Sequence, residues 1–391
     1  MKLLLLIYNY EAGFPFIQDI EKNLKLQPGI EVDVLDTNNL VLRQHKGGKK
    51  NLAGSLGRKL VRLPKIGFRI KIILLRRVLA HMKGKYDVVN IHNCDLIYTY
   101  LMPSFRAITD NVYPMMWGSD FYRASEMQRT QKKAIFDASR YIIFANPVNA
   151  RDFIAHYQDY REKAIINGFG VAKFDSIKEV SEKESIESLK KSFDLPTDKI
   201  IVAVGYNGTK GQQHVKLLDE IAQLPADIKS RLFLVLQMTY GFQQDYCNEV
   251  EGRAAALGLD YRVLKEFFDD EKTSRLRLAI DVVLNAQITD GFSSSIQEHI
   301  FAGNIVVVGD WLPYQPLELA QIFYLRTPLD GFGSKLVSVV EKYDEMKAAT
   351  QGNSEKIYRL SSWSNRIKSW VSIYRGEGEK FLYQEHDMKI S

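Results

Sequence analysis

The chain has 391 residues, about twice the length of a typical domain, and 46% of them are hydrophobic, which predicts two globular domains with apolar cores. Its two cysteines, Cys94 and Cys247, are too few for a disulfide framework and are consistent with a reducing compartment. No run of about 18 apolar residues exists, which excludes a membrane span and predicts a cytoplasmic protein.

The first half of the chain alternates apolar runs with amphipathic stretches, the pattern of parallel βαβ units. The opening run "LLLLI" is too short for a signal peptide and is expected to be a buried first strand. The predicted strands of this half are "KLLLLIY", "IEVDVLD", "DVVNIH", "VYPMMW", "YIIFAN" and "AIINGFG".

The interval between Asp36 and Asp87 contains 14 lysines and arginines but no acidic residue. Since the whole chain carries a formal net charge of +6, the remainder carries −8. In "LGRKLVRLPKIGFRIKIILLRRVLAHM" the cations are interleaved with apolar residues, and Pro64 is expected to divide the segment into two helices. Basic amphipathic segments bind anionic membrane surfaces. The predicted membrane contact consists of Arg58, Lys59, Arg62, Lys65, Arg69, Lys71, Arg76 and Arg77.

Two other interpretations of this segment remain open. Basic stripes also bind nucleic-acid backbones, but Phe68 is the only aromatic residue here, which disfavours base stacking. The segment could equally be a solvated helical face. We expect no nucleic-acid partner.

Residues 175–198 are charged and serine-rich, which predicts a partly helical connection between the domains. The second half then repeats the alternation, with predicted strands "KIIVAVG", "RLFLVLQM", "YRVLKEF", "DVVLNA", "NIVVVGD" and "IFYLR". We therefore expect an α/β fold with two Rossmann-like doubly wound domains and a cleft between them, at the carboxyl ends of their sheets. The first domain is expected to span 1–178, joined by a C-terminal helix at about 366–391, and the second to span 179–365.

The stretch "DGFSSSIQEHIFAG", residues 290–303, follows the apolar run "DVVLNA". Its serines are candidate N-caps for a helix that Gly303 would end. The N-terminus of such a helix attracts phosphate, while the carboxylates of Asp290 and Glu298 could accept hydrogen bonds from sugar or ribose hydroxyls. Alternatively, the two acids only complement the helix dipole.

The spacing Asp290-x7-Glu298, with Gly291 and Phe292 after the first acid, resembles the E-x7-E region of GT-B glycosyltransferases, above all the retaining family four. "DVVNIHN" is similar to their strand ending in a histidine that contacts the donor sugar, here His92. "WGSD" resembles their "HGxD" turn, "IINGFG" resembles "ipNGvd", and "VAVGYNGTKG" resembles "vGRl…KG".

The resemblance implies three groups of site residues. The catalytic group comprises His92, Asp290 and Lys210. The acceptor side comprises Gly118, Ser119 and Asp120. The donor-binding group comprises Gly205, Lys210, Gly291, Phe292, Ser293, Ser294 and Glu298, together with Gly13, which follows the first strand and could also serve only a turn. Without the resemblance, Lys210 could be a solvated loop lysine and His92 a structural histidine.

The sequence departs from the family in four respects. Tyr206 and Asn207 stand where the family has a phosphate-binding arginine, Asp290 replaces a glutamate, Ser293 replaces a glycine and Trp117 replaces a histidine. These differences leave open a more distant GT-B family, such as the bacterial transferases that add 4-acetamido-4,6-dideoxygalactose to a lipid-linked chain.

The resemblance implies a glycosyltransferase that moves sugar from a UDP- or GDP-linked donor to a lipid-linked saccharide in bacterial surface polysaccharide assembly. We expect a retaining, metal-independent enzyme without a cofactor, peripheral on the inner face of the plasma membrane. No D-x-D motif with suitable surroundings and no zinc-like cluster is present. Two alternatives are a GT-B nucleotide-sugar epimerase, which would not need the basic apolar segment, and a non-catalytic saccharide- or nucleotide-binding protein, which fits the missing arginine.

Overall fold

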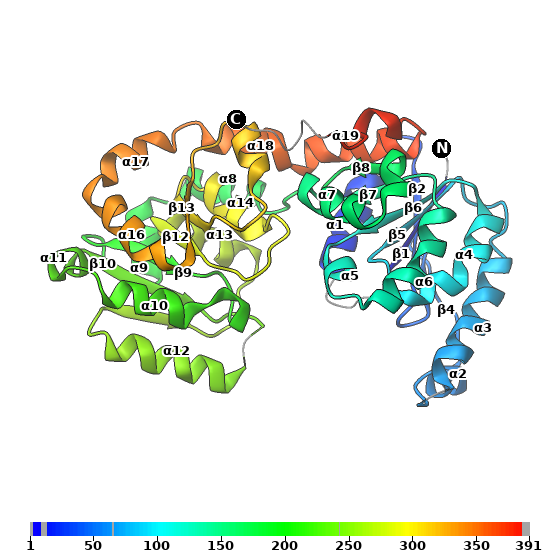
Figure 1. Cartoon of the computed structure of the whole chain (residues 1–391), viewed down its shortest axis with the longest axis horizontal. Helices are drawn as coiled ribbons and strands as arrows, with labels where there is room; N and C mark the ends of the chain where they lie inside the picture. Colours follow the sequence, from blue (N-terminus) through cyan, green and yellow to red (C-terminus); the bar gives the residue numbers. More distant parts are fainter. Residues whose placement is uncertain (1–2, 9–13, 65, 242, 385–391) are drawn as a thin grey trace. The chain divides into compact units, whose positions relative to one another are not determined.

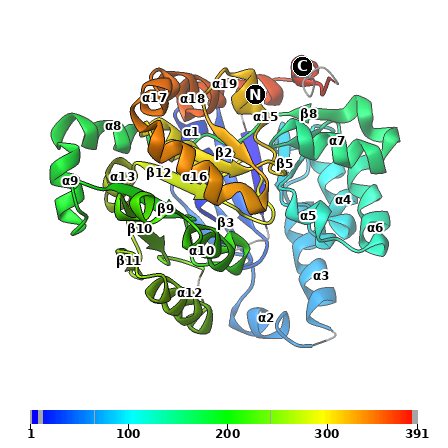
Figure 2. The same cartoon turned by 60° about the vertical axis from the view of Figure 1, so that its left-hand side comes forward.

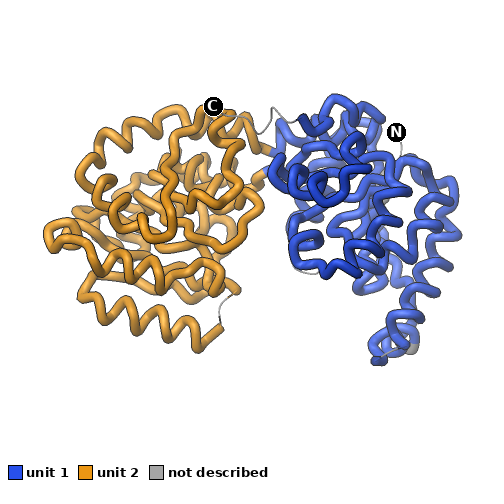
Figure 3. The backbone as a smooth tube through the Cα atoms, viewed as in Figure 1, with its two compact units in different colours: residues 1–170, 363–391 blue, residues 171–362 orange. Residues whose placement is uncertain are grey.

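The computed structural model describes residues 3–8, 14–64, 66–241 and 243–384, and it divides into two compact units (Figure 3). Unit 1 comprises residues 1–170 and 363–391, and unit 2 comprises residues 171–362. Both changes of unit lie slightly before the boundaries expected from the sequence, at 178 and 366.

Unit 1, whose helices are labelled in Figure 1, is built on an eight-stranded sheet with the order β4-β3-β2-β1-β5-β6-β7-β8. Neighbouring strands from β2 to β8 are parallel, whereas β3 and β4 add an antiparallel hairpin beyond β2. The six predicted strands are confirmed, and the hairpin was not predicted. The bounds are β1 (Leu3–Tyr8), β2 (Glu31–Asp36), β3 (Val41–Arg43), β4 (Lys49–Asn51), β5 (Val88–His92), β6 (Val112–Met116), β7 (Ile142–Phe144) and β8 (Ala164–Ile166).

Helices cover both faces of this sheet because successive strand side chains point to opposite sides. Ile7 packs in the apolar cluster formed with α3, α4, α6 and α7, whereas Leu6 and Tyr8 pack in the cluster formed with α1 and α19. The bounds are α1 (Phe14–Lys25), α2 (Ser55–Leu60), α3 (Gly67–Ala80), α4 (Leu96–Ile108), α5 (Ser119–Tyr122), α6 (Glu126–Asp137), α7 (Pro147–His156) and α19 (Trp363–Tyr374), with 3₁₀ turns η2 (Gln158–Lys163) and η5 (Gly378–Phe381).

Unit 2 contains a parallel six-stranded sheet with the order β11-β10-β9-β12-β13-β14. This is the Rossmann order, in which the direction of winding reverses between the first and fourth strands, here β9 and β12. All six strands predicted in the second half are confirmed. The bounds are β9 (Ile200–Val204), β10 (Leu232–Gln237), β11 (Tyr261–Leu264), β12 (Val282–Asn285), β13 (Ile305–Gly309) and β14 (Leu325–Thr327).

The helices of unit 2 also form two layers. One apolar cluster includes α8, α9, α13, α14 and α18, and the other includes α10, α12 and α16. The bounds are α8 (Phe174–Lys183), α9 (Ile186–Ser192), α10 (His214–Ala222), α11 (Ala226–Ser230), α12 (Gln244–Ala256), α13 (Asp270–Ala279), α14 (Ser294–Phe301), α15 (Gln315–Leu319), α16 (Phe332–Glu341), α17 (Tyr343–Ala349) and α18 (Asn353–Ser361), with η3 (Lys210–Gln212) and η4 (Leu329–Gly331).

The interpretation of residues 175–198 as an interdomain connection is wrong. Helices α8 and α9 belong to unit 2 and pack against α13, as Figure 2 also shows. Their few apolar residues are spaced so that Phe174, Val180 and Leu189 are all buried in one cluster. A narrow apolar stripe is enough to hold a surface helix, even where the rest of its sequence is charged.

The predicted division of the basic segment at Pro64 is confirmed. Helix α2 ends at Leu60 and α3 begins at Gly67. Proline cannot donate a backbone hydrogen bond and disfavours helical conformation in the residue before it. Figures 1 and 2 both show α2 beyond the far end of α3, projecting from the body of unit 1.

Within the described ranges, no helix combines the length and the hydropathy required to cross a bilayer.

Candidate functional site

The loops that follow β9 and β12 meet at the carboxyl ends of these strands. The backbone N–H of Ile288 donates to the carbonyl of Gly211 at 2.9 Å, and the side-chain amide of Gln213 donates to the carbonyl of Ala286 at 2.6 Å. A Cβ on Gly211 would lie 2.7 Å from the Gln287 Oε1 atom. Glycine therefore permits the close approach of the two loops.

Gly205 forms the turn out of β9. Its φ is +73°, and a Cβ at this position would lie 2.9 Å from both Gln212 Oε1 and His214 Nε2. The same Gln212 oxygen accepts the backbone N–H of Tyr206 at 3.2 Å. A side chain at position 205 would be strained and would also disturb the Gln212 contact.

Lys210 begins the 3₁₀ turn η3 and is exposed. Its ammonium nitrogen lies 5.7 Å from the centroid of the Tyr246 ring, a cation–π contact. Among the described residues it has no ion-pair partner. Its charge therefore remains available to an anion at this edge of the sheet.

Asp290 sits in a network of polar side chains. Its Oδ2 atom accepts from the Tyr314 hydroxyl at 2.7 Å and from the Asn285 amide at 3.3 Å. Burial raises the pKa of Asp290, while the hydrogen bonds from Tyr314, Asn285 and the backbone of Gly291 and Ser293 oppose that rise. The carboxylate is therefore held in one orientation.

The N-terminus of α14 follows this network. Ser293 is its N-cap and accepts from the backbone N–H of Ser295 at 3.2 Å, as predicted. Ser294 is the first helical residue, and Gly303, with φ +76°, follows the end of the helix. The remaining N–H groups of the first turn and the dipole of α14 favour an anion here.

Gly291 and Phe292, the two residues between Asp290 and the cap, differ from each other in how tightly they are packed. Phe292 has φ +73°, unusual for an aromatic residue, and its ring packs edge-on against Tyr314 with 5.5 Å between centroids. A Cβ on Gly291 would meet no atom within 4 Å. Local packing therefore does not require glycine at 291, and open space surrounds it.

Glu298 is buried within unit 2 and paired with a cation. Its Oε2 atom accepts from Arg277 Nε at 3.0 Å, and Arg277 also donates to Gln237 at 3.1 Å. The second carboxylate oxygen lies 3.9 Å from Lys173 Nζ. Burial lowers the pKa of Lys173, but Glu298 and Asp270 outweigh it and raise the pKa overall. The side chain predicted to bind ribose is thus part of a structural ion-pair network.

His92 ends β5 in unit 1 and is fully buried, and neither ring nitrogen has a hydrogen-bond partner among the residues that the structure describes. The ring is surrounded by Phe169, Trp117 and Trp370, at centroid distances of 5.8, 6.3 and 6.1 Å. Burial lowers the pKa of His92 to about 3, so the imidazole is neutral at physiological pH.

The predicted acceptor-side turn follows β6 in the same sheet. Gly118 has φ +90° and precedes α5, and Ser119 is exposed on its first turn. The Asp120 carboxylate turns inward and accepts from the backbone N–H groups of Cys94 at 2.8 Å and Trp117 at 3.0 Å. Burial raises the pKa of Asp120, and these bonds oppose the rise. Asp120 therefore ties together the loops after β5 and β6.

Other residues of the resemblance also lie at this edge. Asn167 follows β8 and is fully buried, and its side-chain amide bonds to no residue in the described part of the chain. The Gly168 carbonyl accepts from the indole N–H of Trp370 on α19 at 3.1 Å. Gly13 and Lys65 lie outside the described residues.

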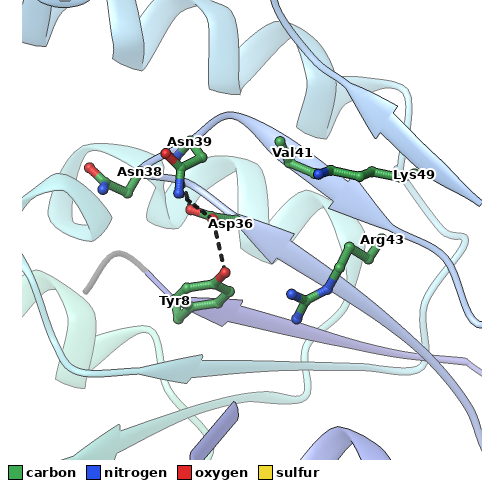
Figure 4. A pocket seen from close by; sticks show the side chains of 7 residues that line it. All are labelled: Tyr8, Asp36, Asn38, Asn39, Val41, Arg43 and Lys49. Carbon is green, nitrogen blue, oxygen red and sulfur yellow. Dashed lines mark hydrogen bonds between the residues drawn. The ribbon is translucent and has the colours of Figure 1, made fainter. Parts of the chain in front are cut away.

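A cavity of about 300 Å³ opens where β1 and β2 end, beside the unpredicted hairpin (Figure 4). Asp36 on its wall accepts from the Tyr8 hydroxyl at 2.8 Å and from Asn39 at 2.8 Å. Arg43 and Lys49 bring positive charge, and the Arg43 guanidinium also pairs with Glu21 on α1 at 3.0 Å. The cavity combines amide, aromatic and cationic groups that suit a hydroxyl-rich ligand carrying negative charge. The lining residues are Tyr8, Asp36, Asn38, Asn39, Val41, Arg43 and Lys49.

The predicted membrane-contact residues are largely on the surface of α2 and α3. Exposed apolar side chains lie among them, with Ile73 52% and Ile66 50% exposed. Lys71 differs because it is half-buried, and burial lowers its pKa, opposed by Asp95 and Asp36. The exposed cations are Arg58, Lys59, Arg62, Arg69, Arg76 and Arg77.

Four residues of the second sheet's edge were missed from the sequence: Lys173, Arg277, Asn285 and Tyr314. Asn285 carried a signal, because a polar residue ending a wholly apolar strand commonly marks a site at the carboxyl edge. The other three contact the site from distant parts of the chain, and their local sequence gives no such sign. Among the described residues, no group of three or more histidine, cysteine or carboxylate side chains could hold a metal ion.

No protein-family model matches the sequence, and no curated protein is significantly similar to it in sequence. Solved structures do match. A glycosyltransferase from Rickettsia africae has a TM-score of 0.73 and 13% identity, with 96% of this chain and 98% of that chain covered. Sucrose-phosphate synthase from Thermosynechococcus elongatus has a TM-score of 0.71 and 13% identity, with 96% of this chain and 99% of that chain covered. HepE from Anabaena, crystallised in complex with UDP, has a TM-score of 0.69 and 16% identity, with 96% of this chain and 100% of that chain covered. These likenesses show that the chain has the fold of two Rossmann-like domains found in GT-B glycosyltransferases.

Proposed function

We propose that the protein is a glycosyltransferase that takes a sugar from a UDP- or GDP-linked donor. The observation that carries this proposal is the edge of β9 and β12, where an unpaired lysine, a helix N-terminus and a fixed carboxylate lie on loops bonded to each other. The complex of HepE with UDP shows that a protein of this fold binds such a nucleotide.

In this proposal the donor diphosphate lies between Lys210 and the first turn of α14. Both would stabilise the negative charge that develops on the leaving nucleoside diphosphate as its bond to the sugar breaks. Transfer would need no metal ion, because the lysine and the helix dipole supply the positive potential. This arrangement also accounts for the loss of the family arginine at Tyr206 and Asn207, since one cation and the helix remain.

The two acids would have different tasks. Asp290 is oriented by Tyr314 and Asn285 and would accept from a hydroxyl of the transferred sugar. Glu298 would accept from the ribose only through the oxygen that faces Lys173, because Arg277 occupies the other. We propose a retaining reaction, as in family four, and assign no enzymic nucleophile.

The acceptor would bind unit 1. The cavity beside Tyr8 and Asp36 offers amides and cations for a saccharide, and the buried His92 ring retains unused hydrogen-bonding capacity near the end of β5. The acceptor class that fits the basic, apolar surface of α2 and α3 is a lipid-linked saccharide, as used in bacterial surface polysaccharide assembly. The enzyme would then work in the cytoplasm on the inner face of the membrane.

The donor part is tested by calorimetric titration with UDP, GDP and their glucose and galactose conjugates, followed by assays for slow donor hydrolysis. Binding of one nucleotide with hydrolysis of its sugar conjugate is expected. Failure of all nucleotides to bind would refute the proposal. Binding without hydrolysis or transfer to any added saccharide would favour the second candidate, a non-catalytic nucleotide- or saccharide-binding protein, which the residues at 206 and 207 also suit.

The membrane part is tested by vesicle sedimentation. Changing Arg58, Arg62 and Arg69 to glutamate should release the protein from anionic vesicles, since each cation near such a surface contributes about 1 kcal/mol. The matched control changes Lys178, Lys183 and Lys191, exposed on α8 and α9, to glutamate and should retain most binding. Equal loss of vesicle binding in both variants would mean that binding depends only on the net charge of the protein. It would contradict a membrane contact located on α2 and α3.

A further inference from the structure

A second cavity, of about 610 Å³, lies on the opposite side of the β3–β4 hairpin from the cavity in Figure 4. Alternation along β4 places Lys49 in one cavity and Lys50 in the other. The larger cavity is bounded by the hairpin, the end of α3 and the loop before β5. Its floor is apolar and includes Leu42, Met82 and Tyr86, all buried.

Three elements each bring one cation to this cavity. Lys50 comes from β4, Arg77 from α3 and Lys85 from the loop before β5. Among the described residues, none of the three has an ion-pair partner. The one carboxylate of the lining, Asp33, is buried and already accepts from the Tyr86 hydroxyl at 2.7 Å and the His45 backbone at 2.8 Å. The lining thus carries three cations against one carboxylate, which leaves an excess of positive charge in the cavity.

The position of the cavity separates it from the proposed transfer reaction. Lys85 and Tyr86 lie shortly before β5, which begins at Val88, so the cavity lies towards the amino end of that strand. Substrates of doubly wound sheets bind at the carboxyl ends. The cavity is, however, next to the proposed membrane contact, since Ile73, 52% exposed, lies one helical turn from Arg77 on the same face of α3.

We propose that this cavity binds the phosphate head group of an anionic membrane lipid, with the start of its acyl chains on the apolar floor. The three cations favour a phosphate monoester, which carries close to two negative charges and three acceptor oxygens. The floor favours an amphiphile over a free anion, because it offers Leu42 and Met82 where a hydrated ion would need polar partners. This site works independently of the transfer reaction and would fix the orientation of unit 1 on the bilayer.

The test uses the full chain and dihexanoyl phosphatidic acid, titrated as monomers below its micelle concentration. We expect saturable binding that falls by at least about tenfold in the Lys50→Gln/Arg77→Gln variant. The matched control is Lys46→Gln/Lys83→Gln, which removes the same charge from exposed positions near the cavity but outside its lining and should keep its affinity within about twofold. All four side chains are exposed, and thermal unfolding verifies that both variants fold.

Two further ligands separate the sources of binding. Inorganic phosphate should bind far more weakly than the lipid, and dihexanoyl phosphatidylcholine should compete poorly, because its choline opposes the cations. Equal affinity for inorganic phosphate, or equal loss in the two variants, would overturn the proposal. UDP titration of the same variants should be unchanged, so failure here is distinguishable from failure of the donor site.

Discussion

The two acids at the carboxyl edge of unit 2 and the histidine at the carboxyl edge of unit 1 have opposite surroundings, although both sheets are doubly wound. In unit 2, Asp290 is bonded to Tyr314 and Asn285, and Glu298 is paired with Arg277. In unit 1, His92 lies among aromatic rings, and neither of its ring nitrogens bonds to another described residue. A buried polar group left unpaired costs about 1–3 kcal/mol. The two acids of unit 2 are therefore held in place by their protein partners, whereas the imidazole of His92 keeps hydrogen-bonding capacity that no described residue uses.

Glu298→Ala tests this contrast with the largest expected effect on stability. The change leaves the Arg277 guanidinium buried without its carboxylate, and the free energy of unfolding should fall by about 3–5 kcal/mol. Urea denaturation measures the loss. Glu187→Ala, which breaks the exposed pair with Lys191, is the control and should leave the midpoint nearly unchanged. Similar midpoints for both variants would show that the Glu298 pair is not structural, and reduced nucleotide binding could then be read directly as a ribose contact.

Lys210→Ala should leave stability unchanged but weaken UDP binding by about tenfold or more, because it removes the one unpaired cation of the β9 loop. Calorimetric titration measures the affinity. Lys216→Ala, an exposed lysine on α10, serves as the matched control. If the two variants bound UDP alike, the diphosphate would not lie at Lys210.

His92→Phe tests whether the buried imidazole of His92 lowers the stability of unit 1. Removing a partnerless imidazole should raise the free energy of unfolding by about 1 kcal/mol at neutral pH. The pKa of His92 is lowered to about 3, so its contribution to stability is present above the unfolded value of about 6.5 and is lost as pH falls below it. The variant should therefore gain stability relative to the parent protein as pH decreases from neutral. Parallel curves in urea unfolding at several pH values would contradict this, and transfer activity should fall in either case.

Asp290→Asn should have the smallest effect on stability. Because burial raises the pKa of Asp290, its contribution is present below the unfolded value of about 3.9 and is lost as pH rises through the folded value. The variant should thus gain relative stability as pH rises above about 4, by a small amount because Tyr314 and Asn285 oppose the shift. A relative stability that falls with pH in the same measurement would mean that the carboxylate, not the acid, is favoured at this site.

The strands were predictable because buried parallel strands are nearly continuous apolar runs, as in "KIIVAVG". The β3–β4 hairpin was missed because β4 is "KKN", which has neither apolar residues nor alternation, and its partner β3 has three residues. The hairpin forms because β3 pairs with the edge of β2, β4 pairs with β3, and Gly47, with φ +89°, allows the turn between them.

The local features of the site were also predictable, but its contacts were not. The cap at Ser293 and the end of the helix before Gly303 follow from residue type and position alone. Arg277 is 21 residues from Glu298, and Tyr314 is 24 residues from Asp290. The sequence around each residue gives no indication of which distant side chain it contacts. The sequence also left open that Asp290 and Glu298 only complement the helix dipole. That alternative did not include the side-chain cation, Arg277, with which Glu298 is paired.

The hairpin has a consequence for how this molecule could change over evolution. Because Lys49 and Lys50 are adjacent on one strand, deleting a single residue from the turn at 44–48 would rotate both onto the wrong sides of the sheet. The smaller cavity would then receive Lys50 in place of Lys49, and the larger cavity would lose one of its three cations. Insertions in this turn should therefore be tolerated two residues at a time. In a library of hairpins of every length, binding at the two cavities should return with every second added residue.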